Sequence, residues 1–289
     1  MKTRILTLAM ILSLMIVSCT KKDSEDNTTV SEDEININYN IDAAADDISN
    51  VLEEQLLLTN NDGLGRGTAA IFAGCATITR TPAAGTTPII GSTVSKVIDF
   101  GMRCEQPNGN VLSGKINMSF IYNPSAPVQV VTYIFENFFH NARKFNGQKT
   151  FTRSMTATSA SNPTSNPIVV MTMDMLITLP DGRTFTRVGT RTREMTAGFG
   201  TIALNDNEFK ITGEWTTTYP NTSVQTSTIV NPLLIKYSCA TSNSALVSQG
   251  IINFVRNSNN ATLDYGNGNC DNEAVFTLNG VSRTITLRR

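Results

Sequence analysis

From about residue 70 onward, apolar and polar side chains alternate along the chain. This period places one face of a β-strand in the core and the other in solvent. The clearest runs carry an apolar residue at every second or fourth position: Met171, Met173, Met175, Ile177 and Leu179; Phe209, Ile211 and Trp215; Ile285 and Leu287. Four turn-forming pairs punctuate this part of the chain: Asn108-Gly109, Asn146-Gly147, Asp181-Gly182 and Asn279-Gly280. The pattern predicts a mainly β fold, an antiparallel meander of about a dozen strands arranged as a sandwich, an open barrel or one curved sheet.

Residues 130–139 depart from this alternation because nearly all of them are apolar. A continuous apolar run is typical of a strand that is buried on both faces. We therefore expect this strand to be covered on both sides.

Ahead of the β-rich part, apolar residues fall at helical spacing between residues 41 and 60: Ala44, Ala45, Ile48, Val51, Leu52 and Leu56. Asp42, Asp46 and Asp47 lie near the expected start, where the helix macrodipole favours negative charge. The sequence Asn60-Asn61-Asp62-Gly63 is typical of a helix end. We expect one helix over 41–60, packing on a β-rich domain that spans 61–289.

The first 18 residues have the pattern of an export signal. Lys2 and Arg4 precede an apolar run from Ile5 to Val17, which is too short to span a bilayer. The run ends in Ile16-Val17-Ser18-Cys19, which resembles the lipobox of bacterial lipoproteins. The resemblance implies that residues 1–18 are removed and that Cys19 carries an acyl chain such as palmitate. An ordinary signal peptide followed by an incidental cysteine is the alternative.

Residues 19–40 are polar and acidic, a composition that cannot bury enough apolar surface to fold, so they are expected to form a disordered tether. Lys22-Asp23-Ser24-Glu25-Asp26 resembles the surface-export signal of Bacteroidota lipoproteins. The alternative is that these charges only keep the tether soluble. The expected location is the outer membrane, with the cell surface and the periplasmic face both open.

Setting Cys19 aside leaves an even number of cysteines, which in an exported protein points to disulfides. Two similar segments each lead to a cysteine, Asp99-Phe100-Gly101 before Cys104 and Asp264-Tyr265-Gly266 before Cys270. Each has another cysteine upstream, Cys75 in the first case and Cys239 in the second. This repeated arrangement predicts the pairs Cys75–Cys104 and Cys239–Cys270, each closing the open end of a hairpin. It also suggests an internal duplication. Free buried thiols are the alternative.

The amino-acid composition argues against several classes of function. Hydrophobic residues make up 40% of the chain, charged residues 16%, and the formal net charge is −1. These values argue against a disordered chain and against a nucleic-acid partner. No sequence signature of a nucleotide, cofactor or hydrolase site is found, so no cofactor is expected.

The single histidine, His140, is the first candidate for chemistry. Residues 136 and 140 share a face of an unbroken strand, so Glu136 and His140 can approach each other. The catalytic interpretation is a base-and-orienter pair that activates a serine nucleophile. A structural histidine is the preferred interpretation.

A calcium site is the second candidate. Oxygen-bearing side chains cluster at Asp264, Asn267, Asn269, Asp271 and Glu273, and Ca²⁺ takes six to eight oxygen ligands. The spacing does not match an EF-hand loop, and an Asn/Gly-rich turn before a disulfide is the preferred interpretation.

The third candidate is a stripe of arginines, Arg183, Arg187, Arg191 and Arg193, whose odd numbers place them on one face of a strand. One interpretation is a basic binding face for an acidic glycan or an anionic lipid. The preferred one is cross-strand pairing, with Arg193 opposite Glu208 and Arg187 opposite Glu214.

The lipobox, the tether and the Thr/Asn-rich meander together resemble uncharacterised β-rich lipoproteins of Bacteroidota. That resemblance implies an envelope location and brings no activity. The leading hypothesis is a lipid-anchored, non-enzymatic protein that uses a β-sheet surface for binding or scaffolding, with the membrane and a glycan or protein as partners. The alternatives are a carrier whose curved sheet encloses an apolar ligand and a carbohydrate-active enzyme.

Overall fold

The computed structural model describes residue 30 and residues 32–61, 74–106, 109–158, 165–199, 201, 205–242 and 244–287. The export signal, Cys19 and the segment up to residue 29 lie outside the described residues, so the acylation and export predictions stay predictions.

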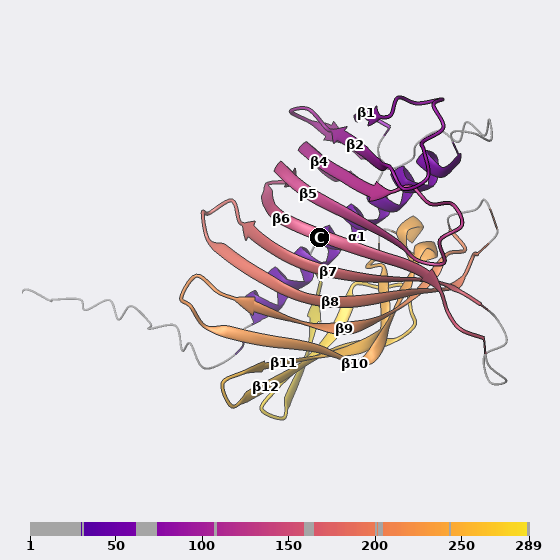
Figure 1. The fold of residues 1–289 in the computed structure, drawn as a ribbon. Helices are drawn as coiled ribbons and strands as arrows, with labels where there is room; N and C mark the ends of the chain where they lie inside the picture. Colours follow the sequence, from indigo (N-terminus) through magenta and orange to yellow (C-terminus); the bar gives the residue numbers. More distant parts are fainter. Residues whose placement is uncertain are drawn as a thin grey trace, which may run out of the picture.

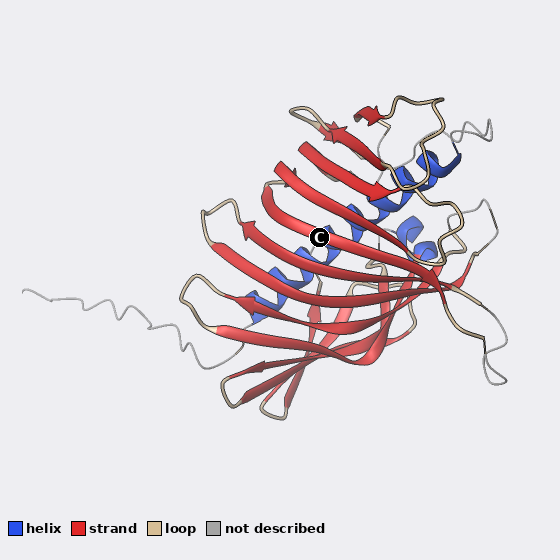
Figure 2. Ribbon diagram, viewed as in Figure 1, coloured by secondary structure: helices blue, strands red, loops and turns tan. Residues whose placement is uncertain are grey.

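The described chain forms one helix, one 3₁₀ turn and a single antiparallel sheet of 14 strands (Figure 2). The elements are α1 (Glu32–Asn61), β1 (Thr77–Thr81), β2 (Thr93–Asp99), β3 (Cys104–Glu105), β4 (Val111–Ile121), β5 (Gln129–His140), β6 (Arg143–Met155), β7 (Pro167–Thr178), β8 (Thr184–Ala197), β9 (Glu208–Thr218), β10 (Val224–Lys236), η1 (Tyr237–Ser242), β11 (Val247–Arg256), β12 (Asn259–Asn267), β13 (Glu273–Leu278) and β14 (Val281–Thr286).

The strands pair in chain order from β1 to β14, except that the short β3 joins β4 at the side. The mainly β meander is thus confirmed, and of the three arrangements considered the structure adopts the curved, open sheet. α1 crosses the strands on the inner side of the curve, and β11–β14 bend back beneath it (Figure 1). We call the side that faces α1 the inner face.

α1 begins at Glu32, earlier than expected, so residues 32–40 belong to the fold and the tether prediction is wrong for them. Ile35 and Tyr39 continue the helical spacing and are buried. The polar residues between them hide this pattern in the sequence. The helix ends at Asn61, as its closing residues predict.

Two clusters of buried apolar residues line the inner face, and α1 contributes to both. The first cluster joins residues of β2–β8 to Ile48, Leu52 and Leu56 of α1. The second joins β9–β14 to Ile35 and Tyr39. The alternating runs behave as predicted, since Met171, Met173, Met175, Ile177, Leu179, Ile211, Trp215, Ile285 and Leu287 are all buried. One helix therefore closes the core of the whole sheet.

Strand β5 is covered on one face only, which corrects the expectation for residues 130–139. Val130 is 50% exposed and Ile134 is 49% exposed, because no element that the structure describes packs on the outer face there. Asn146-Gly147 is likewise not a turn but lies inside β6, where Gly147 allows close approach of the backbone of β7. Asp181-Gly182 and Asn279-Gly280 do lie in turns between strands.

Both predicted disulfides form. Cys75 is bonded to Cys104 with a Cα–Cα distance of 5.5 Å, and Cys239 to Cys270 with 5.0 Å. The first closes the open end of the β1–β2 hairpin and the second that of the β11–β12 hairpin.

Candidate functional site

The four arginines of the predicted stripe divide into two groups. Arg187, Arg191 and Arg193 are only 2%, 4% and 6% exposed, since α1 covers the inner face of β8. Arg183 precedes the strand, is exposed and donates from Nε to Asp181 Oδ2 at 2.8 Å. The four residues therefore do not form one open binding face.

The predicted cross-strand partners of these arginines are wrong as well. In the observed register Arg193 lies opposite Ile211, and Arg187 lies opposite Thr217. The acidic partner comes instead from α1, because the helix lies directly over this face of the strand. Asp42 Oδ1 accepts from both Arg187 Nη1 and Arg191 Nη2, the second at 2.7 Å.

Further contacts complete this buried polar layer. Arg187 Nη2 donates to Asn38 Oδ1 at 2.6 Å, and Arg193 Nη1 donates to Asn50 Oδ1 at 3.1 Å. The guanidinium carbon of Arg191 lies 4.0 Å from the centroid of the Trp215 ring, within cation–π range. The layer fixes α1 to the sheet through the terminal guanidinium nitrogens, whereas the Nε atoms of the three arginines are buried without a hydrogen-bond partner among the described residues.

A cavity of about 530 Å³ lies beside this layer, between α1, the β5–β6 end of the sheet and strands β10–β12. Its lining residues come from five separate parts of the sequence: Tyr39, Asn40, Asp42, Ala43, Ala44, Asp46, Asp47; Gly109, Asn110; His140, Asn141, Arg143; Arg191; and Leu233, Leu246, Val247, Ile252 and Tyr265. Such a volume suits a small organic molecule.

A β-bulge decides which residues of β5 reach this cavity. The pairing between β5 and β6 shifts between Phe135 and Phe138, where Asn137 has a φ of 45°. The extra residue reverses the alternation, so His140 points inward while Glu136 is exposed and bonded to Asn117. The predicted approach of Glu136 to His140 is therefore wrong, because it assumed an unbroken strand.

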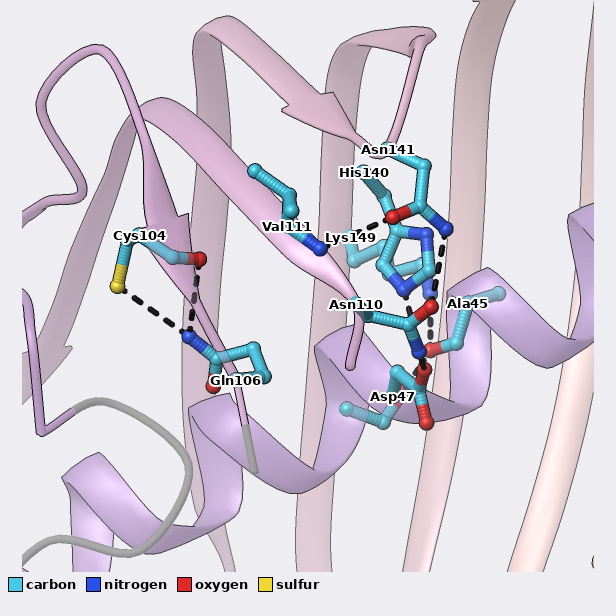
Figure 3. A network of polar contacts seen from close by, with 10 residues as sticks. Ala45, Asp47, Cys104, Gln106, Asn110, Val111, His140, Asn141 and Lys149 are labelled. Carbon is cyan, nitrogen blue, oxygen red and sulfur yellow. Dashed lines mark hydrogen bonds and ion pairs between the residues drawn. The ribbon is translucent and has the colours of Figure 1, made fainter. Parts of the chain in front are cut away.

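His140 is oriented instead by Asp47 of α1, as Figure 3 shows. Its Nε2 lies 3.1 Å from Asp47 Oδ2, which also accepts from Asn110 Nδ2 at 2.5 Å. Asn141 Nδ2 in turn donates to Asn110 Oδ1 at 2.9 Å. This chain of contacts ties the hairpin end of β5 to the helix.

The contact with Asp47 indicates the tautomer of His140. A carboxylate accepts, so Nε2 carries the hydrogen and, in the neutral ring, Nδ1 keeps a lone pair. Nδ1 is buried and has no hydrogen-bond partner among the described residues. The ring thus keeps one buried, unpaired acceptor, in a residue that lines the cavity.

Burial destabilises the charged forms of two further groups near the cavity, Asp46 and Lys149. Desolvation raises the pKa of Asp46, although Arg191 and Arg193 act to lower it. Desolvation also lowers the pKa of Lys149 to about 8, and its Nζ donates to Ala45 O at 3.3 Å. Asp46 lines the cavity, whereas Lys149 lies beneath the helix backbone (Figure 3).

The calcium candidates take part in local turn contacts. Asp264 Oδ1 accepts from Gly266 N at 2.9 Å, and Asp271 Oδ1 accepts from Glu273 N at 3.0 Å. Asn267 ends β12 and Asn269 follows it in the same loop. Over the part of the chain that the structure describes, no group of three His, Cys, Asp or Glu residues is placed to hold a metal ion.

Sequence reasoning missed Asp46, Asp47 and Arg143 as residues of one site. One signal was present, because Asn38, Asp42 and Asp46 recur at four-residue spacing and so form a polar stripe along the helix. That stripe indicates a polar partner but does not say which strand provides it.

No family model, curated protein or solved structure matches this chain. Among the described residues, no helix combines the length and apolar character that crossing a membrane requires.

Proposed function

We propose that this protein is a lipid-anchored envelope protein that binds a small polar ligand in the cavity beside α1. The observation that carries the proposal is the buried and unpaired Nδ1 of His140, a residue that lines a cavity of about 530 Å³. An unpaired buried polar atom costs free energy, and a ligand that donates a hydrogen bond to it recovers that loss.

The cavity favours a polar ligand over a lipid. α1 and the two apolar clusters occupy the inner face, so the curve of the sheet is filled rather than hollow. The remaining cavity is lined on the helix side by Asp42, Asp46 and Asp47. Carboxylates bind hydrogen-bond donors, whereas an apolar lipid chain packed against them would remove their solvation without providing a partner.

The sequence supports the membrane anchor. The described fold begins at Val30, eleven residues after Cys19. A chain of that length reaches at most about 40 Å when fully extended. The domain would therefore lie close to the membrane that holds the acyl chain, with its cavity accessible from the same compartment.

The binding role is tested by filling the cavity. In Leu246→Trp the indole takes up part of the cavity, whereas Val188→Trp adds the same group on the outer face, where Val188 is half exposed. Protein is purified from native membranes and denatured, and released small molecules are identified by mass spectrometry. We expect one mass from the wild type and Val188→Trp that Leu246→Trp lacks. Equal release from all three proteins, or none from the wild type, would contradict a ligand in this cavity.

The anchor is tested separately at Cys19. Intact-mass analysis of membrane-extracted protein is expected to show an acylated N-terminus at Cys19, and the Cys19→Ser variant is expected to lose both the acyl mass and the membrane association. An uncleaved leader without an acyl group would rule the anchor out.

A further inference from the structure

The walls of the cavity differ in chemistry. The end formed by α1, β5 and β6 carries charged and polar groups, among them Asp46, His140 and Arg143. The lining also includes Leu233, Leu246, Val247 and Ile252, from β10, from β11 and from the residue that precedes β11. A ligand that contacts both sets of residues needs a polar head and an apolar body.

We infer that the cavity takes a zwitterionic ligand, an amino acid or short peptide with an apolar side chain, whose ammonium group binds His140 Nδ1 and Asp46 and whose carboxylate binds Arg143. This inference deepens the proposed function and rests on it.

The position of Arg143 supports the carboxylate contact. Arg143 is the cross-strand partner of His140 at the first pair of the β5–β6 hairpin, so the two side chains leave the sheet on the same side. It forms no ion pair with any acidic group that the structure describes, although burial lowers its pKa. A half-buried guanidinium without a carboxylate is a ready partner for one from a ligand.

The ammonium contact rests on two acceptors. His140 Nδ1 is buried and lacks a donor among the described groups. The Asp46 carboxylate has no described hydrogen-bond donor either, and it faces the same cavity. Asp42, by contrast, is already engaged by Arg187 and Arg191, which leaves Asp46 as the carboxylate that an ammonium group can neutralise.

A sugar fits this arrangement less well. Carbohydrate sites commonly present the exposed face of an aromatic ring, whereas the two aromatic residues of this lining, Tyr39 and Tyr265, are buried in the second cluster. Arg143 together with the acceptors His140 and Asp46 in the same lining matches the opposite charges of an amino acid backbone instead.

The test uses the mature full-length protein and isothermal titration calorimetry with leucyl-leucine. Two capped analogues separate the charges: the N-acetyl dipeptide lacks the ammonium group and the dipeptide amide lacks the carboxylate. We expect leucyl-leucine to bind and each capped analogue to bind at least about tenfold more weakly. Equal affinity for all three, or binding of maltose in preference to the dipeptide, would overturn the ligand class.

Variants assign each charge to its residue. Arg143→Gln is expected to weaken leucyl-leucine binding about tenfold while leaving the affinity for the dipeptide amide unchanged. Asp46→Asn is expected to weaken leucyl-leucine binding about tenfold while leaving the affinity for the N-acetyl dipeptide unchanged. Arg183→Gln, at an exposed arginine outside the cavity, serves as the control. If a released mass depends on Leu246 but no peptide binds, the binding function stands and the zwitterion is wrong. If neither result is obtained, both proposals fail.

Discussion

Asp42 is the residue on which the attachment of α1 to β8 depends most directly. Its Oδ1 accepts from two buried arginines, Arg187 and Arg191, and Arg191 also stacks on Trp215. Opposite charges that are buried together stabilise each other mainly because either one alone is so poorly solvated. The penalty for removing one partner is therefore much larger than the net value of the pair.

The Asp42→Asn substitution is expected to lower the free energy of unfolding by about 3–5 kcal/mol, since it removes the carboxylate that is bonded to two buried guanidinium groups. Urea denaturation followed by circular dichroism measures this loss. Asp181→Asn removes the exposed partner of Arg183 and is expected to cost about 0–1 kcal/mol. Similar losses in both variants would show that the buried ion pairs stabilise the protein no more than the exposed pair does.

Lys149, buried beneath α1, gives the stability of the protein a pH dependence. Burial lowers its folded-state pKa to about 8, below the value near 10.5 of an unfolded chain. Between those values the unfolded state binds more protons, so this group makes stability rise with pH. Above pH 10 the buried tyrosines, whose pKa is raised, act in the opposite sense, as Tyr133 illustrates.

Wild-type protein is accordingly expected to gain about 1–2 kcal/mol relative to Lys149→Met between pH 8 and pH 9.5. Urea midpoints at pH 7.5, 8.5 and 9.5 measure the difference. Parallel curves for the two proteins would mean that Lys149 keeps an ordinary pKa in the folded state.

At the scale of elements, the bulge in β5 determines the cavity. It reverses the strand's alternation, so His140 faces α1 and Glu136 faces solvent. Gly114 of β4 makes the bulge possible, because a Cβ atom at this position would collide with the carbonyl oxygen of Asn137. Gly114 also adopts a φ of 81°, which residues with a side chain rarely adopt.

The Gly114→Ala substitution is expected to cost about 3 kcal/mol or more, from backbone strain and the collision together. Gly101→Ala is the matched control, since its φ is also positive but nothing lies within 4 Å of the added Cβ. It is expected to cost about 1–2 kcal/mol. Thermal unfolding measures both, and equal losses would exclude the contact with Asn137 as the cause.

For the whole molecule, α1 joins two clusters that otherwise belong to different halves of the sheet. A core shared in this way is expected to unfold in one step, because losing either cluster exposes the helix to solvent. Trp215 is the only tryptophan and lies in the second cluster, so its fluorescence reports on that half alone.

Substituting Ile48, which lies in the first cluster, provides the test. Ile48→Ala is expected to lower stability by about 2–5 kcal/mol and to shift the Trp215 fluorescence transition as far as the circular dichroism transition. Val188→Ala, on the exposed outer face, is expected to change both by less than about 0.5 kcal/mol. Different midpoints for the fluorescence and circular dichroism transitions of Ile48→Ala would show that the halves unfold separately.

The sequence by itself determined the strand character, the inner face of most strands and both disulfides. These follow from local patterns: alternation with period two selects a face, as in Met171 to Leu179, and a repeated segment marks each cysteine pair. It also determined that a helix precedes the sheet, although polar residues hid its first turns.

Only the tertiary structure decided that the sheet stays open around α1, and which groups meet there. Arg187 and Asp42 are 145 residues apart, and His140 and Asp47 are 93 apart. Such contacts depend on the register of many strands and on where the helix crosses them, which no short sequence pattern encodes. A single bulge in β5 reversed the face of His140, because every residue after an insertion changes side.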